Sequence, residues 1–161
     1  MRQHRFDIPE TQMISSADSY LESALHLEEA WHQKPNIFRS ACVLAALSVE
    51  IYLKSFIAED KSRLVDVING VQIYGGGVGT KRIHGLTQLF DAIPKGWQDK
   101  ILAQSHDQNP NVDLVATLNH YSDFFVEARY EHEPGAKGYL SDDILRLAEH
   151  VKGICHALAQ S

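Results

Sequence analysis

The sequence contains only two cysteines among 161 residues, too few for a disulfide framework. Cys42 and Cys155 each lie among apolar neighbours in a helical pattern, which predicts buried and reduced thiols. The first thirty residues also lack an apolar run behind a basic start, so we expect no secretory signal. Together these absences indicate a cytoplasmic protein.

Long hydrophobic runs and basic residues are scarce as well. The longest apolar stretch, Ala41 to Leu53, is broken by Ser48 and Glu50 and is shorter than the roughly twenty residues of a membrane-spanning helix. We interpret it as a buried core helix and expect no membrane association. Fifteen Lys and Arg against 21 Asp and Glu give a net charge of -6. This balance argues against broad affinity for nucleic acid but leaves a local basic patch open.

The residues that are present predict a single all-α domain over 1–161. Hydrophobic residues make up 44% of the chain, enough to form one core. Apolar residues recur at three- and four-residue steps in four long segments, which predicts long helices near 13–31, 37–58, 111–131 and 141–158. Shorter helices are expected at 84–92 and 97–104. We therefore predict an up-and-down bundle of four long helices plus short ones.

The region between the second long helix and residue 84 has a different character. Leu64, Val65 and Ile68 indicate a weak short helix over 60–70 that ends at Asn69-Gly70. After it, a Gly-rich loop or small β-hairpin is expected at about 71–83, around three consecutive glycines. A Walker phosphate loop is excluded by residue order, because Thr80 precedes Lys81. A surface loop carrying Lys81, Arg82 and His84 fits better.

Glu50 is the most unusual residue of the second long helix. It lies one turn before Lys54, the favourable orientation for a helical ion pair. A carboxylate in so apolar a helix requires a cationic partner from elsewhere, and Arg129 is our first choice. The pair would either fix the register of two helices or orient Arg129 toward a substrate phosphate.

Arg129, Tyr130, Glu131 and His132 form the densest polar cluster of the chain. An arginine can stabilise charge on a phosphorane and a histidine can transfer a proton, so Arg129 and His132 could support metal-independent RNA cleavage. A solvated helix terminus explains the same residues equally well. The histidines do not show the spacing of a metal site, and we expect no metal and no cofactor.

Three segments together are similar to the HEPN family of helical domains. They are Ala46-Leu-Ser-Val-Glu50-Ile-Tyr-Leu-Lys54, His84-Gly-Leu86, and Phe125-Val-Glu-Ala-Arg129-Tyr130. The resemblance spans about two thirds of the chain and rests on the order and spacing of these motifs. It implies a helical bundle, frequent homodimers, and a place among toxin–antitoxin, phage-defence or RNA-processing proteins.

The resemblance also implies a structural set at Glu50, Lys54, His84, Arg129 and Tyr130, a polar seam between helices. Catalytic HEPN members carry Arg, four to six residues, then His, whereas here two residues separate Arg129 from His132. We therefore expect a non-catalytic or weakly catalytic dimer. It would bind RNA, a nucleotide or a protein partner, such as an antitoxin or a nucleotidyltransferase.

In this reading Lys81, Arg82, His84, Arg129 and Tyr130 face the ligand. The alternatives are a metal-independent endoribonuclease that uses Arg129 and His132, and a purely structural interaction module.

Overall fold

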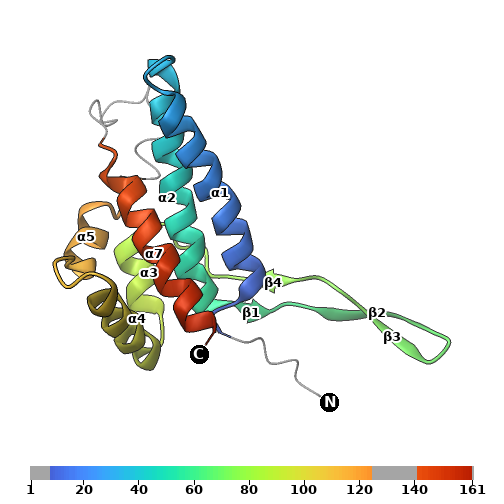
Figure 1. The fold of residues 1–161 in the computed structure, drawn as a ribbon. Helices are drawn as coiled ribbons and strands as arrows, with labels where there is room; N and C mark the ends of the chain where they lie inside the picture. Colours follow the sequence, from blue (N-terminus) through green and yellow to red (C-terminus); the bar gives the residue numbers. More distant parts are fainter. Residues whose placement is uncertain (1–7, 125–140, 161) are drawn as a thin grey trace.

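The computed structural model describes residues 8–124 and 141–160, which are predominantly helical (Figure 1). The described helices and strands, in chain order, are α1 (Thr11–Ala30), α2 (Phe38–Lys54), β1 (Glu59–Asp60), β2 (Arg63–Ile68), β3 (Val71–Gly75), β4 (Val78–Gly79), α3 (Leu86–Ala92), α4 (Lys95–Gln108), α5 (Leu114–His120) and α7 (Asp143–Ala159). Short 3-10 turns at Pro35–Ile37 and Ser55–Ile57 flank α2.

Helices α1 and α2 form an antiparallel pair that is long and closely packed (Figure 1). The carboxylate of Glu10 caps α1 by accepting hydrogen bonds from the backbone N–H groups of Gln12 and Met13, at 3.0 and 2.8 Å. Ala17 and Ala24 of α1 and Ala45 of α2 are fully buried. Because alanine side chains are small, they allow the two helices to approach each other closely.

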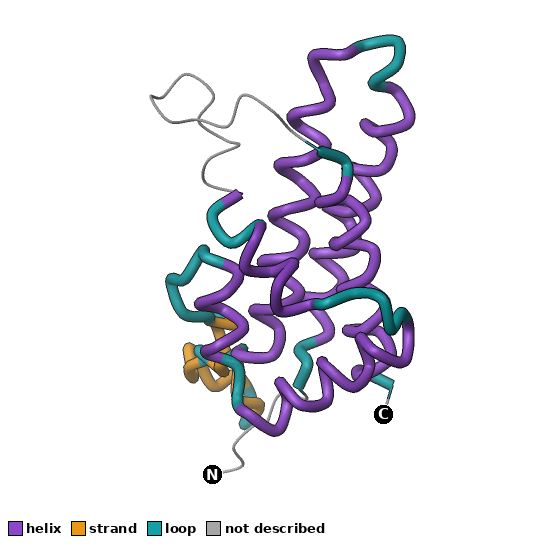
Figure 2. Tube along the Cα trace, turned by 90° about the vertical axis from the view of Figure 1, so that its left-hand side faces the viewer, coloured by secondary structure: helices purple, strands orange, loops and turns teal. Residues whose placement is uncertain are grey.

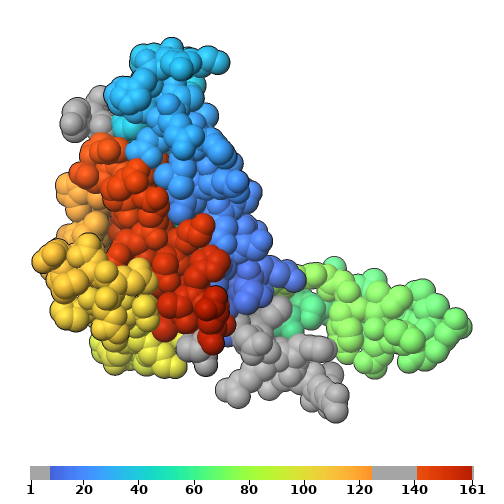
Figure 3. Space-filling model, in the orientation of Figure 1, coloured from blue at the N-terminus to red at the C-terminus, as the bar shows by residue number. Residues whose placement is uncertain are grey.

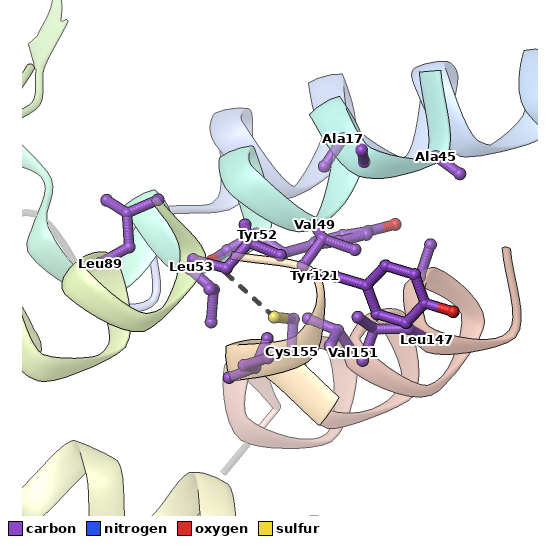
Figure 4. Packing of buried hydrophobic residues seen from close by; sticks show 14 of the residues in the cluster. Ala17, Ala45, Val49, Tyr52, Leu53, Leu89, Tyr121, Leu147, Val151 and Cys155 are labelled. Carbon is purple, nitrogen blue, oxygen red and sulfur yellow. Dashed lines mark hydrogen bonds between the residues drawn. The ribbon is translucent and has the colours of Figure 1, made fainter. Parts of the chain in front are cut away.

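Helix α7 packs against both α1 and α2 and completes the core. It contributes Leu147, Val151 and Cys155 to a cluster with Val49 and Leu53 of α2 (Figure 4). Helix α4 packs on α7, α3 packs on α2, and α5 packs on α3. Both cysteines are buried and free, as predicted. Burial raises the pKa of the Cys42 thiol from 9.0 to about 12.

By length and composition alone, the segment Pro35–Ile57, which contains α2, could cross a membrane. In the fold 72% of its most apolar window is buried against other parts of the chain. Its apolar side chains therefore pack against other parts of the protein, which supports the prediction of a buried core helix.

The helix predicted over 60–70 is wrong, because those residues form a β-ribbon. β2 pairs antiparallel with β3, and Asn69 and Gly70 connect them with φ values of 52° and 80°. Two positive φ angles are typical of a type I′ hairpin turn, for which Asn-Gly is the preferred pair. The Asn-Gly signal that we assigned to a helix end is thus a hairpin turn between strands rich in β-branched residues.

The glycines at 75–77 are correspondingly not the hairpin turn. They lie where the returning strand β3 ends and where β4 begins to pair with β1. An ideal Cβ on Gly75 would lie 2.4 Å from Val65 Cγ2, and Gly76 has a φ of +103°. Glycine is therefore required at both positions by close approach or backbone conformation. The hairpin lies at 63–75, earlier in the chain than predicted.

The single long helix predicted for 111–131 is also wrong. Helix α5 ends at His120, and its C-cap Tyr121 has φ −100° and ψ 11°, outside the helical region. Residues 121–123 form a turn, and the predicted range from 125 onward lies outside the described residues. The buried rings of Tyr121 and Phe124 meet edge to face at 5.4 Å, so packing on the core replaces helical continuity here.

Candidate functional site

Glu50, Lys54 and His84 of the predicted polar seam come together in the structure. Glu50 lies on α2 and is only 3% exposed. Its Oε1 accepts a hydrogen bond from Lys54 Nζ at 2.6 Å and lies 3.0 Å from His84 Nδ1, on the loop before α3. The predicted helical ion pair is therefore confirmed, and His84 joins it from another part of the chain.

The second carboxylate oxygen of Glu50 is different. Oε2 is buried and has no hydrogen-bond partner within residues 8–124 and 141–160. The predicted partner Arg129 lies outside the described residues, as do Tyr130 and His132. A buried carboxylate oxygen without a partner is costly, so this atom is a point at which a hydrogen-bond donor would be stabilising.

Glu50 and Lys54 line a hollow of about 510 Å³ between α1, α2 and the end of the β-ribbon. We call it the α1/α2 groove and define it by its apolar lining, Met13 and Tyr20 of α1, Leu47 and Ile51 of α2, and Val78 of β4. Glu10, which also lines it, is committed to capping α1. The charges of the groove are thus largely engaged within the chain, and the side chains left to a ligand are the five apolar ones together with the neutral polar Gln12, Ser16 and Thr80.

The structure does not gather all of the predicted ligand-binding residues. Lys81 and Arg82 are exposed, but Lys81 lines a separate hollow of about 320 Å³ beside Phe56 and Trp97. His84 alone of this basic segment hydrogen-bonds the Glu50 cluster. Lys81 therefore lines a different hollow from Glu50 and Lys54.

A second polar cluster links α1, α2 and α7 and was missed by the sequence analysis. Asp18 Oδ1 accepts a hydrogen bond from the Tyr52 hydroxyl at 2.5 Å, and Asp18 Oδ2 lies 2.9 Å from His156 Nε2. Burial and the neighbouring Asp18 carboxylate raise the pKa of Tyr52. The available signal was the position of Asp18 within the buried stripe of Ile14 and Leu21.

A further hollow, of about 520 Å³, lies between α5 and α7 and is lined by His150 and Arg146. Burial lowers the pKa of His150, whose Nε2 lies 2.8 Å from the hydroxyl of buried Ser105. Arg146 Nη2 donates to both carboxylate oxygens of Glu28, at 2.5 and 2.6 Å. The His150–Ser105 contact joins α7 to α4, and the Arg146–Glu28 contact joins α7 to α1. Because both contacts link neighbouring helices, we interpret the cluster as structural.

The β2–β3 ribbon is the other conspicuous feature, and we call residues 63–75 the arm. It projects from the end of the helical body (Figures 1 and 3), and the turned view shows the strands gathered at that end (Figure 2). Seven large apolar side chains on it are 40% to 65% exposed, namely Leu64, Val65, Val67, Ile68, Val71, Ile73 and Tyr74. Its only charged residues are Arg63 and Asp66.

In the described part of the chain, no group of three or more His, Cys, Asp or Glu side chains is placed so that it could hold a metal ion. Comparison with protein families, with curated proteins and with solved structures finds no match to this chain.

Proposed function

We propose that this chain is a HEPN-like module that acts by binding a protein partner, with the arm as its contact surface. The observation that carries the proposal is the set of seven large apolar side chains exposed on the arm. An exposed, contiguous apolar surface on a soluble domain marks an interaction site. The up-and-down arrangement of the helices and the dimeric state that the resemblance implies are part of the same proposal.

The arm is expected to be only marginally stable without further contacts. Among the described residues its strands pair only with each other, and an isolated two-stranded hairpin is marginally stable in water. In the described part of the chain neither strand has a second partner strand, and such sheet edges readily pair with another strand or are covered by a partner. A partner that covers the arm would therefore order it and bury its apolar residues at the same time.

The Glu50 cluster supports binding rather than catalysis in this proposal. Lys54 and His84 both bond the same buried carboxylate oxygen, so the two basic groups are occupied in holding α2 and the loop before α3 together. This arrangement fits the structural polar seam that the HEPN resemblance implies.

A second candidate function is the binding of RNA or a nucleotide. It is favoured by Lys81 and Arg82, which are exposed next to His84 near the base of the arm. Phosphate contacts from such residues would weaken steeply as salt rises. Fluorescence anisotropy of a labelled RNA pool over a salt series, with wild type and Lys81→Ala/Arg82→Ala, measures this contribution. Equal binding by the two proteins contradicts the second candidate.

The endoribonuclease alternative, with Arg129 and His132 as catalytic residues, predicts cleavage of the RNA pool in EDTA. Our proposal predicts intact RNA with wild type. Cleavage by wild type that is lost in a still-folded Arg129→Ala variant would contradict a binding module.

The direct test of the proposed function is site-specific crosslinking in the native host. A photoreactive amino acid is placed at Val67 on the arm or, as a control, at Val115, an apolar residue of α5 that is 47% exposed but lies off the arm. We expect a discrete crosslinked adduct from position 67 and none from position 115. The proposal is contradicted if position 67 yields no adduct or if both positions yield the same ones.

A further inference from the structure

We infer that the arm of one chain docks in the α1/α2 groove of a second copy, so that two chains exchange arms. The inference rests on the proposed function and names its partner and binding site. The groove begins at the base of the arm, because Val78 of β4 forms part of the lining of the groove. The arm itself extends away from the helices (Figures 1 and 3). Within residues 8–124 and 141–160, each chain therefore presents an exposed apolar arm next to an open groove.

The dimensions of the two surfaces agree. A six-residue strand such as β2 is about 20 Å long at the usual rise per residue. The α1 residues that line the groove run from Glu10 to Tyr20, a distance of about 15 Å along a helix. The groove is therefore long enough to receive most of one strand of the arm.

The chemistry of the two surfaces agrees as well. The arm carries one positive and one negative side chain, Arg63 and Asp66, so it has no net charge with which to select a nucleic acid. The exposed groove residue Tyr20 and the half-buried Leu47 and Ile51 offer an apolar counterpart to its valines and isoleucines. Apolar contact between the two surfaces would remove both from water.

A second copy satisfies both surfaces at once, which a different protein would do only if it carried both an arm-binding and a groove-binding surface. In a two-fold symmetric pair, each contact is made twice by the same residues. Both arms and both grooves are then filled. Exchange of an identical element between protomers is also a low-cost way to form a dimer.

The test uses the purified full chain and two variants. The arm variant, Val65→Thr/Val67→Thr/Val71→Thr, preserves β-branched shape and strand preference while removing apolar surface. The groove variant, Met13→Gln/Tyr20→Gln, changes incompletely buried positions of α1 to a residue with good helix propensity. Val115→Gln, on the exposed face of α5, is the matched control. Circular dichroism and thermal unfolding check the fold of each.

Sedimentation equilibrium should show a wild-type dimer, an unchanged Val115→Gln dimer, and at least tenfold weaker association of each variant alone. Mixing the two variants should restore association in part, because the intact arm of one fits the intact groove of the other. A monomeric wild type at all concentrations overturns the inference. If the arm variant loses association but the groove variant does not, and mixing the two gives no gain, the groove is overturned as the docking site.

Different results would contradict the proposed binding of a protein partner and the exchange of arms between two copies. If the arm variant dimerises as wild type does, the arm is not the contact between copies and this inference is overturned. A crosslink from position 67 in the native host to a protein of another mass would then still support the proposed function. A crosslink at twice the chain mass of 18.1 kDa supports both.

Discussion

The hydroxyl of Tyr52, a fully buried residue in the last turn of α2, donates a hydrogen bond to Asp18 Oδ1 of α1 at 2.5 Å. The same carboxylate lies 2.9 Å from His156 Nε2 of α7. One acidic side chain thus ties together α1, α2 and α7, and its partner Tyr52 belongs to the buried cluster shown in Figure 4.

We expect Tyr52→Phe to lower the free energy of unfolding by about 1–2 kcal/mol, because it removes a buried hydrogen bond to a charged acceptor. Tyr74→Phe is the matched control, since the Tyr74 hydroxyl bonds the Gln72 side chain on the exposed arm. The control should change stability by less than about 0.5 kcal/mol. Urea unfolding of both variants measures the difference. Equal effects would show that the Asp18 contact contributes little.

Asp18→Ala should cost more than Tyr52→Phe, because it leaves the buried Tyr52 hydroxyl without its acceptor. In a double-mutant cycle, the combined Asp18→Ala/Tyr52→Phe protein should therefore be less destabilised than the sum of the two single variants. Strict additivity would contradict a direct interaction between the two side chains.

Glu50→Gln should destabilise the fold by about 2–4 kcal/mol, because it leaves the mostly buried ammonium of Lys54 without its counter-charge. The control is Asp99→Asn, which removes an ion pair of the same i,i+4 spacing with Lys95 on the exposed face of α4. It should cost less than about 0.5 kcal/mol. Comparable losses in the two variants would mean that burial of the Glu50 pair is unimportant.

Stability should fall as the pH rises above about 9. The pKa of Cys42 is raised to about 12 in the fold, so the folded state holds this proton more tightly than the unfolded state. The resulting stabilisation is complete below the unfolded pKa of 9.0 and is lost between about pH 9 and 12. Cys42→Ala should flatten this pH dependence in urea unfolding. An unchanged slope would contradict the assignment to Cys42.

Gly70→Val should disrupt the arm without unfolding the helices. Gly70 has a φ of +80°, which a β-branched residue adopts only at a cost of about 1–2 kcal/mol. The arm amides should exchange faster in hydrogen-exchange measurements, while the helical circular dichroism signal melts as in wild type. Gly77→Ala is the control, because a Cβ there meets no atom within 4 Å. A coupled loss of helical stability would show that the arm is part of the core.

The helices with buried stripes were predictable from sequence, and the ribbon was not. Residues such as Ile14, Leu21 and Ala24 repeat at helical spacing because one face of α1 packs on the core. In the arm both faces are exposed and apolar, so the alternation that marks a half-buried strand is absent. Asn69-Gly70 is then ambiguous, since the same pair ends helices and forms hairpin turns.

Some contacts of the candidate site were predictable from the sequence and others were not. The Glu50–Lys54 pair follows from helical spacing alone, and the family resemblance brought His84 to it. The Asp18–His156 contact joins residues 138 positions apart, so sequence spacing carries no information about it. The α1/α2 groove was also beyond prediction, because it exists only where the base of the ribbon meets the helices.

The central claim is that the arm is covered by protein in its working state, and hydrogen exchange across a dilution series of the purified chain tests it most directly. We predict that amides on the outer edges of β2 and β3, which face no further strand among residues 8–124 and 141–160, are protected at high concentration. Their protection should be lost on dilution and in the Met13→Gln/Tyr20→Gln variant. Rapid exchange of these amides at every concentration would contradict the account.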